Sequence, residues 1–348
     1  MQRRFKWLIA VVVLVCAGWT GIWFYAASYT EKAMDRWIDR QAAQGRKWTC
    51  AGRNISGYPF RMLIRCKSIA FEGPGRGGKI ALSTGAVRIV AQIYNPKLIL
   101  AEAEGPARIV LPSGARTIEA NWSQLRASVR VARPVPQRLS VRMEKPQFEF
   151  ETAGRRETLN MADAEFHLRP APDVTAEFGA TDLAVLVNKA VSSAANRITG
   201  DDAPVNLSIV TRVTRMPLLL AGPRNSRLEH WRSAGGDITV QNIKLIKNRL
   251  ELDASGRLQL DDGRRLSGIM NIRAAGFGRI LQRFGLPALP GGGLLGNLLN
   301  SRKEPTAGAS GQAKKSGSKI FIPLKLRLHD GFVWIGPLRT NMRLKPLY

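Results

Sequence analysis

From Cys66 onward, apolar and polar residues alternate with a period of two in short runs. Successive side chains of a β-strand point to opposite faces of a sheet, so this alternation predicts strands with one buried face. Proline or glycine punctuates nearly every run, as expected for antiparallel strands joined by tight turns. The runs are residues 79–95, 98–104, 107–111, 128–132, 139–143, 147–151, 237–246, 248–262, 265–274 and 320–346.

Two turn sequences strengthen this prediction. Asp262-Gly263 is a strong hairpin signal between two alternating runs. His329-Asp330-Gly331 separates two further runs near the C-terminus, so we expect a closing hairpin in the same sheet and no separate C-terminal domain.

Three segments depart from the alternation. Residues Asp182–Ile198 and Phe277–Phe284 have apolar residues at helical spacing and predict two short helices. Residues 301–319 contain no aromatic or branched aliphatic residue and are rich in Gly, Ser and Lys, so we expect a disordered loop there. The predicted fold class is therefore mainly β, a large curved antiparallel sheet with two short helices.

The N-terminus predicts a membrane segment. Residues 7–27 carry no charge, and at about 1.5 Å per residue they match the ~30 Å hydrocarbon core of a bilayer. Aromatic residues lie at both ends of this segment, as is typical of a transmembrane helix. The alternative is a cleaved signal peptide, but bulky aromatics stand where a cleavage site needs small residues.

The predicted topology follows from the basic residues before this segment. Arg3, Arg4 and Lys6 favour a cytoplasmic N-terminus over residues 1–6. Residues 28–47 then predict a juxtamembrane helix that ends near Gly45. The remaining residues, 48–348, are expected to form a β-rich domain on the other side of the membrane, anchored by a single pass.

Charge adds an expectation about partners. The 53 Lys and Arg residues against 26 Asp and Glu give a formal net charge of +27, which attracts phosphate-bearing surfaces. A GC-rich genome would also raise the Arg content, so the excess has two explanations. No zinc-finger spacing or RNA-recognition signature is present and the arginines are scattered singly, so we expect anionic lipid or glycolipid, not nucleic acid.

Cysteine usage agrees with export. Cys16 lies in the apolar segment, whereas Cys50 and Cys66 flank a short hairpin-like stretch. Outside the cytoplasm such a pair can form a disulfide; the alternative is two unpaired, partly buried thiols. The three histidines are far apart in sequence, so no metal or cofactor is expected.

Three short motifs invite an enzymatic interpretation, and each has a simpler one. Gly73–Lys79 matches the start of a phosphate-binding loop, but Ile80 stands where Ser or Thr is required. Gly291–Gly296 has dinucleotide-binding spacing without a preceding strand, and Ser316 and Lys319 lie in the expected disordered loop. We therefore expect a protein that is not an enzyme.

The stretch between the two cysteines contains a rigid aromatic turn, formed by Gly57, Tyr58, Pro59, Phe60 and Arg61. It either contacts lipid headgroups or a partner, or packs as a corner between the N-terminal helix and the first strand.

These features carry a resemblance. The basic start, the single span, the Cys-flanked Gly57–Arg61 element and the closing Leu328–Pro337 segment resemble the bacterial family called domain of unknown function 2125, over nearly the whole chain. Strands such as Leu250–Leu260 are similar in style to AsmA-like envelope proteins, a likeness that implies a lipid-handling sheet with an apolar face.

We accordingly expect binding or transfer of anionic lipid, or of lipid-linked envelope material, on an apolar sheet face. That face would include Leu250, Leu252, Leu258 and Leu260. The alternative is a non-enzymatic assembly or scaffold protein that binds another envelope protein, by strand addition at an open edge.

Overall fold

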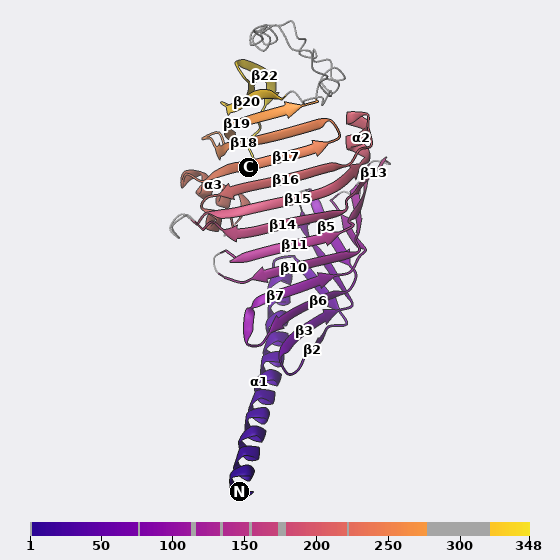
Figure 1. Cartoon of the computed structure of the whole chain (residues 1–348), viewed down its shortest axis with the longest axis vertical. Coiled ribbons are helices and arrows are strands. Elements are labelled where there is room, and N and C mark those ends of the chain that lie inside the picture. The colour runs from indigo at the N-terminus through magenta and orange to yellow at the C-terminus, as the bar shows by residue number, and fades with distance from the viewer. Residues whose placement is uncertain are drawn as a thin grey trace, which may run out of the picture.

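The computed structural model describes residues 2–75, 77–112, 116–132, 135–152, 155–172, 179–220, 223–276 and 321–348. The predicted fold class is confirmed: a long N-terminal helix precedes a large open antiparallel sheet with two short helices (Figure 1). The predicted helix over Phe277–Phe284, the glycine-rich segment 291–296 and the predicted disordered loop over 301–319 lie outside the described residues.

The N-terminal helix α1 (Gln2–Ala42) is continuous, so the predicted span and juxtamembrane helix form one element. It ends earlier than residue 47, because Gly45 has a left-handed backbone (φ 75°) and Lys47 already begins a strand. By length and composition α1 can cross a membrane, and a signal sequence or a single anchor would both look this way.

The strands form two connected layers. The long sheet contains, in spatial order, β2 (Asn54–Ser56), β3 (Arg61–Cys66), β6 (Val87–Gln92), β7 (Asn95–Ala103), β10 (Gln124–Arg130), β11 (Arg138–Glu144), β14 (Asp163–Pro170), β15 (Thr181–Ser192), β16 (Val205–Val213), β17 (Asp237–Lys247), β18 (Leu250–Leu260), β19 (Leu266–Ala275), β20 (Ile322–His329), β21 (Phe332–Ile335) and β22 (Leu338–Arg343). The second sheet contains β1 (Lys47–Ala51), β4 (Ser68–Gly75), β5 (Gly78–Thr84), β8 (Ala107–Val110), β9 (Arg116–Asn121), β12 (Gln147–Thr152) and β13 (Arg155–Asn160). All pairings are antiparallel, and the second sheet lies behind the N-terminal half of the long one in Figure 1.

The chain crosses repeatedly between these sheets. Strand β3 continues into β4 after one residue, and the same crossing recurs from β5 to β6 and onward to β13 and β14. Backbone hydrogen bonds connect neighbouring crossings, for example from Glu104 N to Ala86 O (2.8 Å) and from Lys145 N to Ala162 O (2.8 Å). The two sheets therefore meet along a hydrogen-bonded crease. The predicted disulfide between Cys50 of β1 and Cys66 of β3 joins them near its start.

The helix predicted over Asp182–Ile198 is wrong for most of its length. Residues Thr181–Ser192 form β15, and only Ser193–Thr199 is helical, as α2. The segment pairs with β14 on one side and β16 on the other. Because two complete strand ladders satisfy its backbone, and Val185 and Val187 favour strands, tertiary pairing overrides the local helical spacing.

A small closed core lies in the C-terminal half, under a helix that the sequence pattern does not predict. Val213, Leu260 and Trp231 of α3 (Arg224–Ser233) form a buried cluster, completed by the 3-10 helix η2 (Met216–Leu219) and Tyr348. The Trp231 indole also donates to Thr214 O at 2.7 Å. This cluster covers the long sheet between β15 and β19, where Leu183, Ile238 and Leu266 pack against it.

Tyr348 attaches the end of the chain to α3 through a polar contact. Its hydroxyl donates to a Glu229 carboxylate oxygen at 2.7 Å, and Arg232 pairs with the same carboxylate at 2.6 Å. The hydrogen bonds from Arg232 and Tyr348 lower the pKa of Glu229 from 4.5 to about 2.

This contact predicts a pH dependence. A lowered carboxylate pKa contributes stability that is present above the unfolded value, near 4.5, and is lost as the pH falls toward 2. Glu229→Gln should lower the melting temperature at neutral pH, and its difference from wild type should shrink between pH 4.5 and pH 2. Thermal unfolding across that pH range measures this; a constant difference would contradict it.

The disulfide predicts a loss of stability on its removal. Closing a loop of 16 residues stabilises by about 3 kcal/mol in the chain-entropy model. Joint replacement of Cys50 and Cys66 by Ser should cost roughly 2–5 kcal/mol in the free energy of unfolding. Cys16→Ser, a control at an exposed unpaired cysteine of α1, should cost little. In unreduced protein Cys16 alone should react with an alkylating agent, and labelling of the other two would show that no bridge forms.

Candidate functional site

One face of the long sheet is apolar on every strand from β3 to β20. The paired register places one residue of each strand in a single row across the sheet. The members of this row are Ile64, Ile89, Ala101, Ala127, Val141, Phe166, Val185, Ile209, Ile243, Ala254, Ile272 and Leu324. We call this surface the inner face.

The inner face is only partly covered. Of the row just given, only Ala254 is fully buried, and every other member retains intermediate exposure. The two buried apolar clusters of the described chain both centre on the C-terminal strands, around Leu260 and around Val240. An antiparallel sheet normally packs its apolar face into a core. Across β6 to β15 every member of this row instead stays partly exposed, although Val87 and Leu168 on the same face are buried.

The apolar side of the second sheet faces the same space. Its register aligns Trp48, Phe71, Leu82, Ile109, Ile118 and Phe150 on one side. Helix α1 contacts both sheets, because Trp37 packs against Trp48 (centroids 5.7 Å apart) while Ala26 and Thr30 lie beside the inner face. The apolar sides of the two sheets therefore look toward one another, with α1 entering between them.

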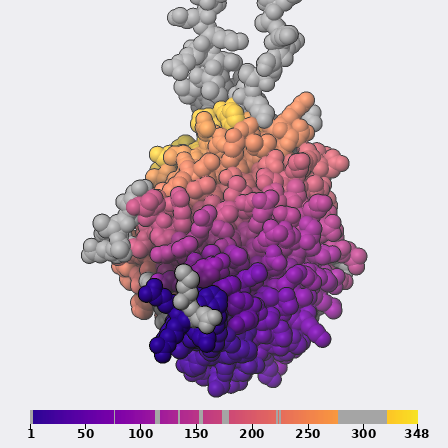
Figure 2. Space-filling model, turned by 60° about the horizontal axis from the view of Figure 1, so that its bottom comes forward, coloured from indigo at the N-terminus to yellow at the C-terminus, as the bar shows by residue number. Residues whose placement is uncertain are grey.

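An apolar pocket lies where α1 meets the inner face. It has a volume of about 270 Å³ and is lined by Ala26, Thr30, Met62, Ile64, Ile89, Ala91, Gln92, Ile93, Pro96 and Ile99. Its size is close to the lower end of small-molecule sites, roughly 300 Å³. Figure 2 looks toward the end where α1 leaves the domain and shows the helix emerging among the N-terminal strands. The inner face thus begins beside the helix that can cross a membrane.

The aromatic turn Gly57–Arg61 packs on α1. The Trp19 indole donates to Pro59 O at 2.9 Å and the Trp23 indole to Arg61 O at 3.0 Å. The Tyr58 hydroxyl lies 2.8 Å from Thr20 Oγ1. The turn is therefore a packed corner between helix and sheet. Tyr58 and Phe60 nevertheless stay 52% and 59% exposed, so their rings also remain available to headgroups.

The four leucines expected on the apolar face lie on the inner face but in different surroundings. Leu252 and Leu258 are partly exposed and pack around Val240. Leu250 and Leu260 are buried, the latter in the closed core under α3. Only the first pair can contact a ligand on this face without unfolding the core.

The sequence pattern misses the polar end of the inner face. Lys247 lies opposite Leu250 and is 2% exposed. Its ammonium group donates to Asn196 Oδ1 at 3.1 Å and pairs with Asp201 at 3.0 Å, which ties α2 to β17. A lysine at an inward position of an alternating strand is a signal that such a contact exists.

Among the residues that the structure describes, no group of three His, Cys, Asp or Glu side chains could hold a metal. The segment resembling a phosphate-binding loop forms the β4–β5 hairpin, with Gly75 opposite Gly78, and leads into a strand. The Ser316 and Lys319 pair lies outside the described residues.

Trp23 offers a test of the helix contact. It is 5% exposed, so Trp23→Ala should cost about 3–5 kcal/mol in the free energy of unfolding, as for other buried Trp residues. Trp7→Ala is the matched control, because Trp7 is 72% exposed on the same helix. Unfolding of the full chain in detergent measures both; equal effects would contradict the docking of the turn on α1.

Comparison with known proteins identifies a family. A family model described as "Uncharacterized protein conserved in bacteria (DUF2125)" matches residues 23–341. No curated protein and no solved structure matches the chain. The likeness to AsmA-like proteins therefore stays a prediction.

Proposed function

The chain belongs to the bacterial DUF2125 family, and we propose that it is a single-pass inner-membrane protein whose periplasmic domain binds or passes anionic lipid or lipid-linked envelope material. The half-exposed inner face, which starts in the pocket beside α1, carries this proposal. The proposed activity is non-enzymatic.

The energetic argument concerns the path of an acyl chain. Exposing one CH₂ group to water costs about 0.8 kcal/mol, so a lipid leaves a bilayer readily only if apolar surface receives its chain. The inner face supplies an apolar row on every strand from β3 to β20, and each member except Ala254 stays partly exposed. Its first residues, Met62 and Ile64, line the pocket with Ala26 of α1.

Contacts of α1 support a retained anchor over a cleaved signal. Trp19 and Trp23 hydrogen-bond to the turn of the folded domain. Cleavage after residue 26 or 27 would remove both indoles and leave the turn without them. The basic N-terminus favours a cytoplasmic start, and the disulfide suits the oxidising periplasm.

Strand β22 supports a second candidate, an assembly or scaffold protein. Within the described chain it pairs only with β21, and Leu338 and Met342 on it are 72% and 57% exposed. An open edge of this kind can accept a strand from another envelope protein.

Two neighbouring residues of β16 test the lipid proposal. Ile209 lies on the inner face opposite Val185, whereas Val210 lies on the other face opposite Ala184. Ile209→Asp should abolish co-purification of lipid, because an unpaired charge among acyl chains is far costlier than a lost side chain. Ile209→Ala should only weaken it, and Val210→Asp should leave it unchanged. Native mass spectrometry of the detergent-extracted full chain measures all of these.

The same experiment separates the two candidates. Folded wild-type protein that carries no lipid would contradict the lipid proposal. If such protein captured another envelope protein, and β22 were needed for the capture, the scaffold function would replace it.

A further inference from the structure

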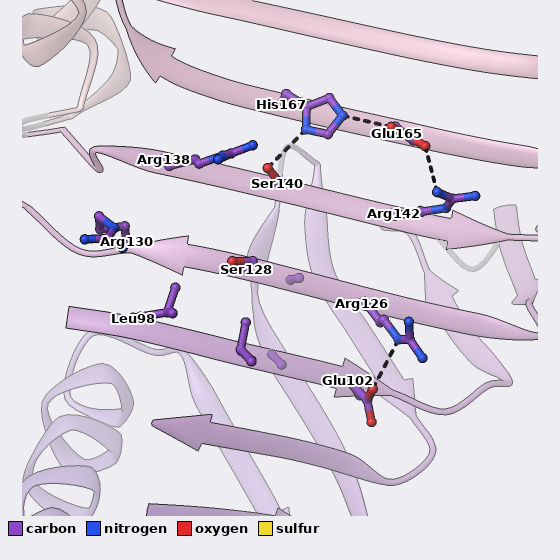
Figure 3. Close-up of a pocket in the computed structure, with 13 residues that line it drawn as sticks. Leu98, Glu102, Arg126, Ser128, Arg130, Arg138, Ser140, Arg142, Glu165 and His167 are labelled. Atoms are coloured by element: carbon purple, nitrogen blue, oxygen red, sulfur yellow. Dashed lines mark hydrogen bonds and ion pairs between the residues drawn. The ribbon is translucent and has the colours of Figure 1, made fainter. Parts of the chain in front are cut away.

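The face of the long sheet opposite the inner face carries two rows of charged residues. The rows differ in their balance of positive and negative side chains. Figure 3 shows the first row across β7, β10, β11 and β14, and Arg130 and Arg138 of the second. One row consists of Glu102, Arg126, Arg142 and Glu165, each directly opposite the next. Arg126 pairs with Glu102 at 3.2 Å and Arg142 with Glu165 at 3.3 Å. Over these four strands the row contains two positive and two negative groups and is balanced; it continues through Arg88 on β6, which pairs with Glu104 at 2.8 Å, and Arg65 on β3.

The second row is strongly positive. It runs through Arg130, Arg138, Arg169, Asp182 and Arg212 on five neighbouring strands. Asp182, its only carboxylate, accepts two hydrogen bonds from Arg212 at 2.7 and 3.2 Å and has Arg169 at 3.8 Å. The single carboxylate is therefore already shared by two guanidinium groups.

Arg130 and Arg138 are the unbalanced pair in this row. They lie directly opposite each other on β10 and β11, and their side chains form no hydrogen bond or ion pair with any residue that the structure describes. Like charges directly opposite in a sheet are destabilising. An anion bound between them would convert this repulsion into attraction.

A cavity of about 790 Å³ is lined by the first row, by Arg130 and Arg138 of the second, and by the polar residues between them. Ser128 and Ser140 lie directly opposite each other, between the two arginine pairs. The Ser140 hydroxyl is 3.1 Å from His167 Nδ1, and His167 Nε2 is 2.9 Å from Glu165. The site thus contains two guanidinium groups, those of Arg130 and Arg138, that have no partner among the described residues, and the hydroxyl groups of Ser128 and Ser140 lie two residues from them along their strands.

We propose that this cavity binds a phosphate group, with Arg130 and Arg138 as its principal ligands. Two guanidinium groups match the double charge and three oxygens of a phosphate, and each fork can donate two parallel hydrogen bonds. A carboxylate, with two oxygens and one charge, needs only one such fork. The phosphate belongs to a soluble pyrophosphate-like ligand or to a lipid headgroup. The site lies on the face opposite the inner face, so it does not depend on lipid binding there.

Pyrophosphate is the probe, and charge-matched double variants provide the control. Arg130→Gln with Arg138→Gln should weaken pyrophosphate binding roughly tenfold or more, because two charge-assisted contacts are lost. Arg126→Gln with Arg142→Gln removes the same charge from the neutral row and should weaken it much less. Isothermal titration of the full chain in neutral detergent at physiological ionic strength measures both.

Thermal unfolding shows whether a loss of pyrophosphate binding comes from a folding defect in the variant. Without pyrophosphate, the variant at 130 and 138 should melt at or above the wild-type temperature, because it removes a repulsion. Pyrophosphate should raise the melting temperature of wild type but not of this variant. Equal loss of binding in both double variants would show a diffuse electrostatic field, and absence of wild-type binding to every probe would also overturn the site.

Vesicles distinguish the two sources of phosphate. Phosphatidylcholine vesicles with and without phosphatidic acid are compared for binding to wild type and to the variant at 130 and 138. Binding that needs both phosphatidic acid and these arginines supports a headgroup. Binding of pyrophosphate through the same arginines, without vesicle binding, supports a soluble ligand.

Discussion

The structure depends on one constraint. One face of the long, open sheet is apolar along its whole length, and other elements must cover it. A closed sandwich would bury this face, but the second sheet extends only from β1 to β13 and joins the long sheet at β15. The core under α3 covers a few strands at the other end. Even with these covers the apolar row stays partly exposed, and burying it further remains favourable by about 25 cal/mol per Å². A bound lipid would bury this remaining apolar surface.

Because apolar and polar residues alternate along the strands, one face of the sheet is apolar and the opposite face is polar and charged. On β11, Leu139 and Val141 lie on the inner face, whereas Arg138 and Ser140 lie on the opposite one. The charge excess of the chain is consequently not spread evenly. One row across β7 to β14 neutralises itself, and its neighbour accumulates arginines around a single carboxylate.

Much of this fold could be predicted from local pattern, since strands, hairpin turns and the inward leucines of β18 follow from alternation alone. Asp182–Ile198 could not, because its apolar residues fit both a helix and a strand, and pairing with β14 and β16 decided between them. The arginine rows were also out of reach, because Arg130 and Arg138 become opposite only through the register of β10 with β11, and Arg169 joins them from β14, further along the chain. The same holds for the crease, whose crossings contain turn residues that resemble ordinary loops.

The position of α1 connects the proposed anchor to the inner face. Trp19 and Trp23, held by the Gly57–Arg61 turn, belong to an aromatic group of the kind that marks a membrane interface, with Tyr58 and Phe60 beside them. Ala26 in the pocket follows Trp23 by three residues, or roughly 4.5 Å along a helix. In the proposed membrane orientation, the apolar pocket therefore opens within one helical turn of the headgroups. An acyl chain could pass from bilayer to sheet without crossing water, and the turn that holds the helix would also set this distance.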